Sequence, residues 1–153
     1  MIRSMVAAWV ACLSLVACSD VGAEMKLYLF SPVTGRVIHN GVPVAGAKIE
    51  RTYNWVWKNE SRSDSTTTDG AGQFQLPAIT RLSLWGSLVP HDPYVEQRID
   101  ILANNVKYTA FQAIRRNYEV NYELDGAPMK LVCRLEQPAT VKERFGGICD
   151  IEK

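Results

Sequence analysis

The side chains best suited to catalysis are few and widely spaced in this sequence. The two histidines, His39 and His91, lie 52 positions apart, and neither stands in a nucleophile or metal-protease motif. His39 borders a turn, and His91 stands with Asp92 between two prolines, so both are expected to be ordinary loop residues. Glu119 and Glu123 share the polar face of one expected strand. The sequence therefore predicts no catalytic residue, no cofactor and no small-molecule substrate, and we expect that the protein is not an enzyme.

The cysteines predict one disulfide. Cys12 and Cys18 belong to the N-terminal segment described below, which leaves Cys133 and Cys149 as an even pair. In an exported protein such a pair most simply forms a disulfide, and closing a loop of about 17 residues contributes about 3 kcal/mol. Metal binding is the alternative, but neither histidine stands at zinc-ligand spacing from a cysteine. We expect no metal site.

The first 17 residues have the pattern of a signal peptide. A short start with Arg3 precedes an uncharged apolar run over residues 5–17, which is too short to cross a bilayer. The run ends in Leu15-Val16-Ala17-Cys18, which resembles the bacterial lipobox. In that resemblance Cys18 carries the lipid and begins the mature protein, and several acyl chains give a firm membrane anchor.

Two alternatives stay open for this N-terminus. Val21-Gly22-Ala23 also fits ordinary signal cleavage, which would release a soluble periplasmic protein, and Met25 could start a cytosolic form. The residue after the lipid-bearing cysteine is Ser19 rather than Asp, which favours the outer membrane, while Asp20 leaves the choice of membrane open. We expect a lipid-anchored protein on the periplasmic side of the cell envelope.

The chain after the signal peptide is electrically neutral. It carries 16 Lys and Arg against 16 Asp and Glu, and neutrality argues against nucleic acid as a partner because nucleic acid selects a basic surface. Its 136 residues suffice for one domain with a core. We therefore expect a signal peptide over residues 1–17, a lipid anchor and linker over 18–26, and one domain over 27–153.

Hydrophobic patterning predicts an all-β domain. Short segments with period-two alternation, separated by turn residues, run along the whole mature chain. Residues 44–57 are expected to form one long strand, and residues 118–124 show the cleanest alternation of a half-buried strand. Residues 58–64 are polar and predict an exposed loop, whereas residues 137–147 predict a loose tail pinned by Cys149.

An aromatic stretch supplies the best candidates for binding. Tyr53, Trp55 and Trp57 alternate along the expected long strand, so they share one face, which usually fills a core. Tyr and Trp also dominate binding hot spots, and this strand leads directly into the polar loop. The predicted partner-binding residues are Trp55, Trp57, Lys58, Asn59, Glu60, Arg62 and Asp64. The tail over residues 137–147 is the next candidate.

Three motifs between residues 35 and 76 carry a resemblance. They are Gly35-x-Val37, then Gly41-x-Pro43-Val44-x-Gly46-Ala47-x-Ile49, then Thr68-Asp69-x-x-Gly72-x-Phe74-x-Leu76. Together they resemble the carboxypeptidase-regulatory-like (transthyretin-like) family, which implies an antiparallel, immunoglobulin-like β-sandwich. In that family the domain usually has no catalysis and serves as a structural or binding module.

A second resemblance bears on function. Leu29-Phe30-Ser31-Pro32-Val33-x-Gly35, Tyr53-Asn54-Trp55 and Tyr122-Glu123-Leu124-Asp125-Gly126 are similar to segments of small bacterial proteins, some linked to type VI secretion effector loci. This resemblance implies an immunity protein that binds a cognate secreted effector in the periplasm and occludes its active site. The alternatives are a structural or assembly lipoprotein of the envelope, and a glycan-binding module that uses Trp55, Trp57 or Trp85.

Overall fold

The computed structural model describes residues 25–83 and 90–152. Within these ranges the chain forms thirteen β-strands and two single-turn 3-10 helices, and no α-helix. The expectations for the signal peptide, for Cys18 and for Trp85 lie outside the described residues. Among the described residues, none forms a helix long and apolar enough to cross a membrane.

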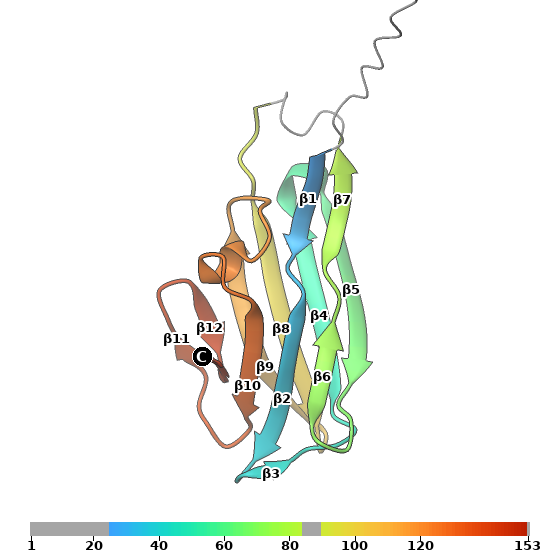
Figure 1. Cartoon of the computed structure of the whole chain (residues 1–153), viewed down its shortest axis with the longest axis vertical. Helices are drawn as coiled ribbons and strands as arrows, with labels where there is room; N and C mark the ends of the chain where they lie inside the picture. The colour runs from blue at the N-terminus through green and yellow to red at the C-terminus, as the bar shows by residue number, and fades with distance from the viewer. Residues whose placement is uncertain (1–24, 84–89, 153) are drawn as a thin grey trace, which may run out of the picture.

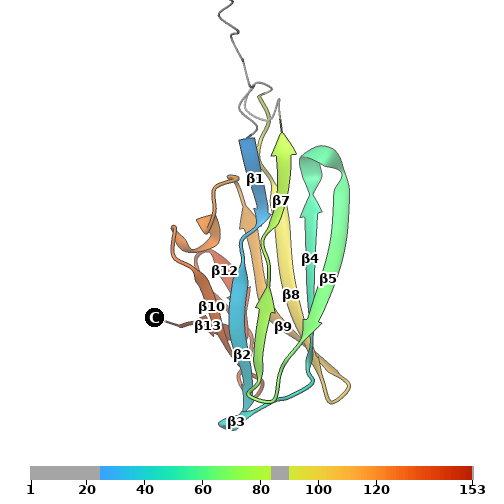
Figure 2. The ribbon, with the colours of Figure 1, turned by 45° about the vertical axis from the view of Figure 1, so that its right-hand side comes forward.

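The strands form two layers that pack face to face (Figure 1). One layer is centred on β2, which pairs in parallel with β10 and antiparallel with β3 and β6. The strands β1 and β7 pair with each other and extend this layer, because β1 leads into β2 and β7 follows β6 (Figure 2). The bounds in this layer are β1 Met25–Phe30, β2 Val33–His39, β3 Val42–Pro43, β6 Gln73–Leu76, β7 Ile79–Ser83, β10 Met129–Arg134 and β13 Cys149–Ile151.

The second layer is a six-stranded antiparallel sheet. Its order is β11-β12-β9-β8-β4-β5, with β8 and β4 in the middle and β5 at one edge. The bounds are β4 Lys48–Trp55, β5 Glu60–Thr67, β8 Val95–Ala103, β9 Val106–Arg115, β11 Thr140–Val141 and β12 Phe145–Gly147. The predicted all-β sandwich is therefore confirmed.

The core lies between the two layers. Alternate residues of each strand point inward, so Ile49 and Ile99 of the six-stranded sheet join the same buried cluster as Val37 and Phe74 of the other layer. Phe74 lies opposite Gly35 in the β2–β6 pair. A Cβ at position 35 would stand 2.6 Å from the Phe74 ring, so this glycine is needed for the close approach of the aromatic ring.

The predicted disulfide is present. Cys133 of β10 and Cys149 of β13 are directly opposite each other in an antiparallel ladder and are bonded to each other. Their Cα atoms are 4.1 Å apart, just below the usual range for a disulfide. Both cysteines are buried, so the bond joins the C-terminal strand to the core.

The expected strand over residues 44–57 is shorter at both ends. Residues 44–47 form a turn, in which the Thr68 hydroxyl accepts a hydrogen bond from the Ala47 amide at 2.9 Å and donates one to the Val44 carbonyl at 2.7 Å. The motif threonine therefore closes this turn. At the other end, Trp57 belongs to the 3-10 turn η1 (Val56–Lys58), and Asn59 follows in the left-handed conformation.

The expected loop over residues 58–64 is wrong, because most of it is strand. From Glu60 onward, β5 pairs with the whole length of β4. The register places Glu60, Arg62 and Asp64 beside Trp55, Tyr53 and Arg51, which are inward-facing residues of β4. Inward-pointing charges are a common device on edge strands, and they hide the alternation that would have predicted a strand.

The expected strand over residues 118–124 and the loose tail are also wrong. Residues 122–124 form the 3-10 turn η2 (Tyr122–Leu124), flanked by Asn121 and Asp125 in the left-handed conformation. The tail forms the β11–β12 hairpin, which adds to β9 at the edge of the six-stranded sheet. Gly147 permits this, since a Cβ there would stand 2.2 Å from the Ala110 carbonyl oxygen and its φ is +133°.

Candidate functional site

The aromatic candidates lie at one end of the sandwich, and Trp55 is not exposed. Trp55 is buried, and its indole N–H donates a hydrogen bond to the Tyr118 hydroxyl at 2.9 Å. The same hydroxyl lies 2.9 Å from Nε2 of His91. Burial raises the pKa of Tyr118, while the bond from Trp55 opposes this rise. Trp55 therefore packs in the core, as one interpretation of the sequence predicted, and its burial does not favour the binding role predicted for it.

Trp57 stands half-buried at the rim, but both faces of its ring are covered. The His91 ring stacks on Trp57 with centroids 3.7 Å apart, and the Lys58 ammonium lies 3.9 Å from the same ring centre. Two groups this close to one centroid must occupy opposite faces. Because glycan binding needs a free aromatic face, neither Trp55 nor Trp57 favours the glycan alternative.

The carboxylates of the predicted binding segment have partners within the fold. Asp64 accepts two hydrogen bonds from the buried guanidinium of Arg51, whose third bond goes to the Pro77 carbonyl at 2.6 Å. Glu60 accepts hydrogen bonds from Tyr53 and from Arg81 of β7, which ties the two layers at their rim. Both carboxylates thus have structural roles. Lys58 and Arg62 are the exposed cations of this segment, and Arg62 lies 3.3 Å from Glu60.

The hydrogen bond between Tyr53 and Glu60 perturbs both groups. Burial, and then the hydrogen bond to Glu60, raises the pKa of Tyr53 to about 12. The bond from Tyr53 lowers the pKa of Glu60, with a further lowering by Arg81 and an opposing effect of burial. The pair therefore remains Tyr-OH with an ionised carboxylate at neutral pH.

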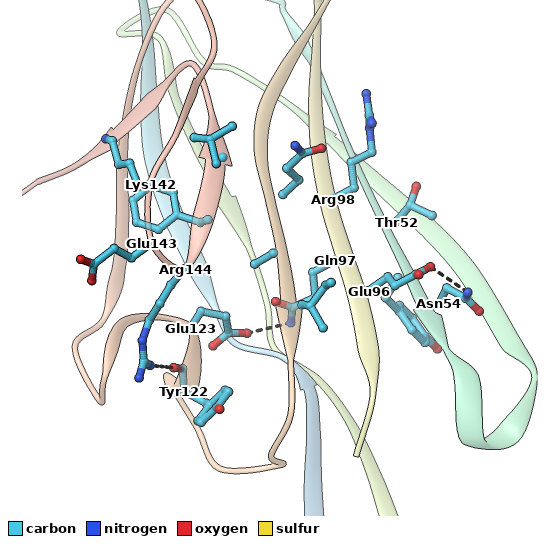
Figure 3. A pocket seen from close by; sticks show the side chains of 17 residues that line it. Thr52, Asn54, Glu96, Gln97, Arg98, Tyr122, Glu123, Lys142, Glu143 and Arg144 are labelled. Atoms are coloured by element: carbon cyan, nitrogen blue, oxygen red, sulfur yellow. Dashed lines mark hydrogen bonds between the residues drawn. The ribbon is translucent and has the colours of Figure 1, made fainter. Parts of the chain in front are cut away.

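A broad concavity lies elsewhere, on the outer face of the six-stranded sheet. This sheet groove has a volume of about 760 Å³ and is lined by β4, β8 and β9, by η2 and by the β11–β12 hairpin. Figure 3 shows Lys142, Glu143 and Arg144 along one side and Thr52, Asn54 and Glu96 along the other. The hairpin is the tail that the sequence ranked as its second binding candidate.

Cross-strand pairing builds the floor of the sheet groove in two rows. One row joins Asn54, Glu96 and Ile114, which are direct neighbours on β4, β8 and β9. The other continues across five strands and consists of Thr52, Arg98, Gln112, Gly146 and Val141. All these positions alternate with inward-facing ones, so their side chains project outward. Gly146 has no side chain, which keeps the floor low between Gln112 and Val141.

Apolar side chains stay exposed in the sheet groove. Ile114 is 50% exposed and Val141 is 90% exposed, and both belong to the groove lining. The half-buried rings of Tyr122 and Phe145 line the same space. Exposed apolar side chains in a concave face that also holds polar groups are typical of a binding surface.

The cations of the sheet groove are already paired within the chain. Arg98 donates to both carboxylate oxygens of Asp100 at 2.9 Å. In the hairpin, Lys142 lies 2.6 Å from Asp150 and Arg144 lies 2.5 Å from Asp125. Two of these carboxylates are shared, because Asp100 also lies 3.0 Å from Lys107 and Asp150 also lies 3.3 Å from Arg134.

Two carboxylates of the sheet groove have no such compensation. Glu96 accepts a hydrogen bond at 2.9 Å from the side-chain amide of Asn54, which carries no charge. Neither Glu96 nor Glu143 forms an ion pair with any of the described residues. The groove lining nevertheless carries three cations and three carboxylates, Glu123 included, so it has no excess of negative charge.

A buried polar network holds η2 against the sheet and so shapes one end of the groove. The Glu123 carboxylate accepts hydrogen bonds from Ser31 Oγ at 2.6 Å, from Gln97 Nε2 at 2.7 Å and from Arg115 Nη1 at 2.9 Å. Burial lowers the pKa of Arg115, and Glu123 opposes that shift. These long-range contacts, rather than strand pairing, fix residues 118–124.

Metal binding finds no arrangement of ligands in the described ranges. Across residues 25–83 and 90–152, no group of three or more His, Cys, Asp or Glu side chains could hold a metal ion. His39, the other histidine, is exposed at the end of β2.

These features define a class: an all-β sandwich with an open groove on the outer face of its six-stranded sheet. Over residues 33–138 the chain matches the family described as "Domain of unknown function (DUF6795)", and it belongs to that family. Comparisons with curated proteins and with solved structures find no significant match. The family match ends just before the β11–β12 hairpin, which forms one wall of the sheet groove.

Proposed function

We propose that this protein is a non-enzymatic lipoprotein on the periplasmic side of a bacterial envelope that binds and neutralises a secreted effector. The binding surface is the sheet groove, and neutralisation occurs because the bound effector cannot admit its substrate. The observation that carries this proposal is the groove itself, in which Ile114 and Val141 stay exposed beside polar and charged side chains.

The construction of the fold supports a binding role. The groove floor belongs to three long paired strands, and its far wall is connected to the core through β12 and through the Cys133–Cys149 disulfide. A surface fixed in this way loses little conformational entropy when a partner binds, which favours tight and specific binding. The resemblance to proteins linked to type VI secretion effector loci supports a secreted effector as the partner. The lipobox-like N-terminus supports the periplasmic side of the envelope as the location.

A protection assay tests this function. A secreted toxin encoded beside this chain is directed to the periplasm of a susceptible host, with or without the full-length protein. We expect survival only when the protein is present. The variant Ile114→Glu should lose protection, because it places a charge in the binding surface. The matched variant Val106→Glu should retain it, because Val106 is equally exposed on the same strand and lies outside the groove.

The outcomes separate the candidate functions. Failure of the wild-type protein to protect, at a normal level in the envelope, would contradict the immunity role. Co-purification of the same groove with an envelope protein instead would indicate the structural or assembly alternative.

A further inference from the structure

We infer that one end of the sandwich rests on the surface of the membrane that holds the lipid anchor, with anionic headgroups as its partner. In the six-stranded sheet, the last paired row at this end consists of Trp55, Val95 and Arg115. The tethered end is defined by the residues beyond that row and by the last two pairs of β1 and β7: residues 25–26, 56–59, 82–83, 90–94 and 116. The inference rests on the lipid anchor of the proposed function and goes beyond it by naming the surface that faces the bilayer.

The length of the tether limits which part of the domain can reach the membrane. Met25, the first residue of β1, lies seven positions after Cys18, and seven fully extended residues span at most about 25 Å. The strands β1 and β2 run in line along the long axis of the sandwich (Figure 1, Figure 2), and their six and seven residues together span about 43 Å. Because the tether is shorter than the sandwich, the opposite end cannot turn to the membrane.

Apolar side chains stay exposed at the tethered end. Leu82 is 65% exposed and Val56 is 51% exposed. Leu82 pairs directly with Lys26 across β7 and β1, so both side chains project from the same side of this ladder. Apolar groups beside a lysine suit the boundary between headgroups and acyl chains, because the apolar part enters that boundary while the ammonium stays at the phosphates.

Cations outnumber carboxylates at the tethered end. Its charged side chains are three cations and one carboxylate, namely Lys26, Lys58, Arg116 and Asp92. Asp92 lies 3.4 Å from Arg116. Neither lysine forms an ion pair with a carboxylate of residues 25–83 or 90–152. Two positive charges are therefore available to anionic lipid.

The surrounding charges do not cancel this excess. The neighbouring rows add two cations and two carboxylates, namely Arg62, Arg81, Glu60 and Glu96. The buried pair of Arg115 and Glu123 adds no net charge. Glu119 lies further from the end, since residues 117–121 turn back along β1, where the Tyr118 carbonyl accepts a hydrogen bond from the Tyr28 amide at 3.0 Å.

Each cation of the tethered end lies over an aromatic ring. The pairs, with the distance from the charged group to the ring centre, are Lys26 with Tyr28 at 5.2 Å, Lys58 with Trp57 at 3.9 Å and Arg116 with Tyr94 at 5.2 Å. Trp and Tyr are enriched where proteins meet a membrane surface, because their rings combine an apolar body with a polar edge. With this end on the bilayer, the sandwich stands upright and the sheet groove on its side stays open to a partner.

Quenching by lipid tests which end of the domain meets the bilayer. The full-length protein, purified with its lipid anchor, is reconstituted into vesicles of equal parts phosphatidylglycerol and phosphatidylethanolamine, with or without bromine on the acyl chains. An environment-sensitive fluorescent amino acid replaces Leu82 or, as the matched control, Val42, which is 64% exposed on β3 at the opposite end. We expect bromine to quench the label at position 82 about twofold or more and to leave position 42 unchanged, because only an interfacial side chain approaches the acyl chains.

Charge variants test the role of the two lysines. Lys26→Gln combined with Lys58→Gln should lower the ratio of contacting to free domain, read from the quenching at position 82, by about 5- to 25-fold, since each lysine near an anionic surface contributes about fivefold. Lys48→Gln combined with Lys130→Gln is the matched control, because it removes the same charge from positions outside the tethered end. The difference between the two variants should shrink as salt is raised and vanish in vesicles of phosphatidylcholine.

Three results would overturn the inference: no quenching at position 82, equal quenching at positions 82 and 42, or equal effects of the two double changes. Other outcomes separate this inference from the proposed function. Wild-type protein that does not float with vesicles would contradict the lipid anchor, and this inference with it. Flotation without quenching at position 82 would contradict the inference alone, whereas quenching there without protection against the effector would contradict the immunity role alone.

Discussion

Replacing Asp64 by asparagine tests whether this carboxylate serves the fold, as the structure indicates, or a partner, as the sequence suggested. The Arg51 side chain that Asp64 holds is 0% exposed, whereas Asp64 is 42% exposed. An asparagine in place of Asp64 could keep one hydrogen bond but would leave the guanidinium charge buried without a counter-ion. Breaking a fully buried pair costs about 3–5 kcal/mol, and the exposure of Asp64 lowers the expected loss to about 2–4 kcal/mol.

The assay is urea unfolding of the oxidised protein followed by tryptophan fluorescence, with a thermal melt beside it. For a domain of this size the expected loss lowers Tm by on the order of 10 °C. Asp92→Asn is the matched control, because Asp92 pairs with Arg116 at 3.4 Å and both side chains are more than half exposed. We expect that control to change the free energy of unfolding by less than about 1 kcal/mol.

A second variant tests the same reasoning through the order of two stability losses. Arg51→Met removes the buried charge itself and leaves Asp64 partly hydrated, so it should destabilise the protein less than Asp64→Asn does. A larger loss for Arg51→Met, or a loss below about 0.5 kcal/mol for Asp64→Asn, would show that the buried charge does not govern the stability of this edge.

Four further predictions concern other parts of the molecule. Cys133→Ser combined with Cys149→Ser should lower the free energy of unfolding by about 3 kcal/mol in urea titrations, and a loss near zero would contradict the contribution assigned to the disulfide. Phe74→Ala should cost about 3–5 kcal/mol by leaving a cavity over Gly35, measured in the same way; a loss under about 1 kcal/mol would mean that the site collapses. Because the pKa of Tyr53 in the folded protein is about 12, against 10.0 ordinarily, its stabilising effect is complete below pH 10 and is lost as pH rises from 10 to 12. Stability curves should therefore fall less steeply over that interval in Tyr53→Phe, and identical slopes would contradict the shift. Labelled fatty acid should enter the wild-type protein but not Cys18→Ser, which should leave the membrane fraction; retention of the variant in membranes would place the anchor elsewhere.

Regular strands and the motif turns could be predicted from the sequence because their causes are local. Period-two alternation directs residues such as Ile49 and Phe74 inward, and Asp69 closes its own turn by accepting hydrogen bonds from the amides of Ala71 and Gln73. The Cys133–Cys149 pairing was the only even pairing left after the N-terminal segment was set aside.

The groove could not be predicted because its parts depend on distant contacts. Residues 118–124 alternate as a strand would, yet Glu123 is the buried member, held by Ser31, which is 92 positions away. The strands β11 and β12 are only two and three residues long and are stabilised by β9 and by the disulfide. The one local signal in this tail was Gly146-Gly147, which marks a close backbone approach in a strand rather than a loose loop.

Site-specific photocrosslinking in living cells tests the central claim, that the sheet groove is the partner-binding surface, most directly. A photoreactive residue is placed at Ile114 or, as the matched control, at Val106, which are 50% and 48% exposed on the same strand β9. We expect that Ile114, in the groove, gives an adduct with one secreted protein and that Val106 does not. The same adduct from both positions, or an adduct from Val106 alone, would contradict the claim.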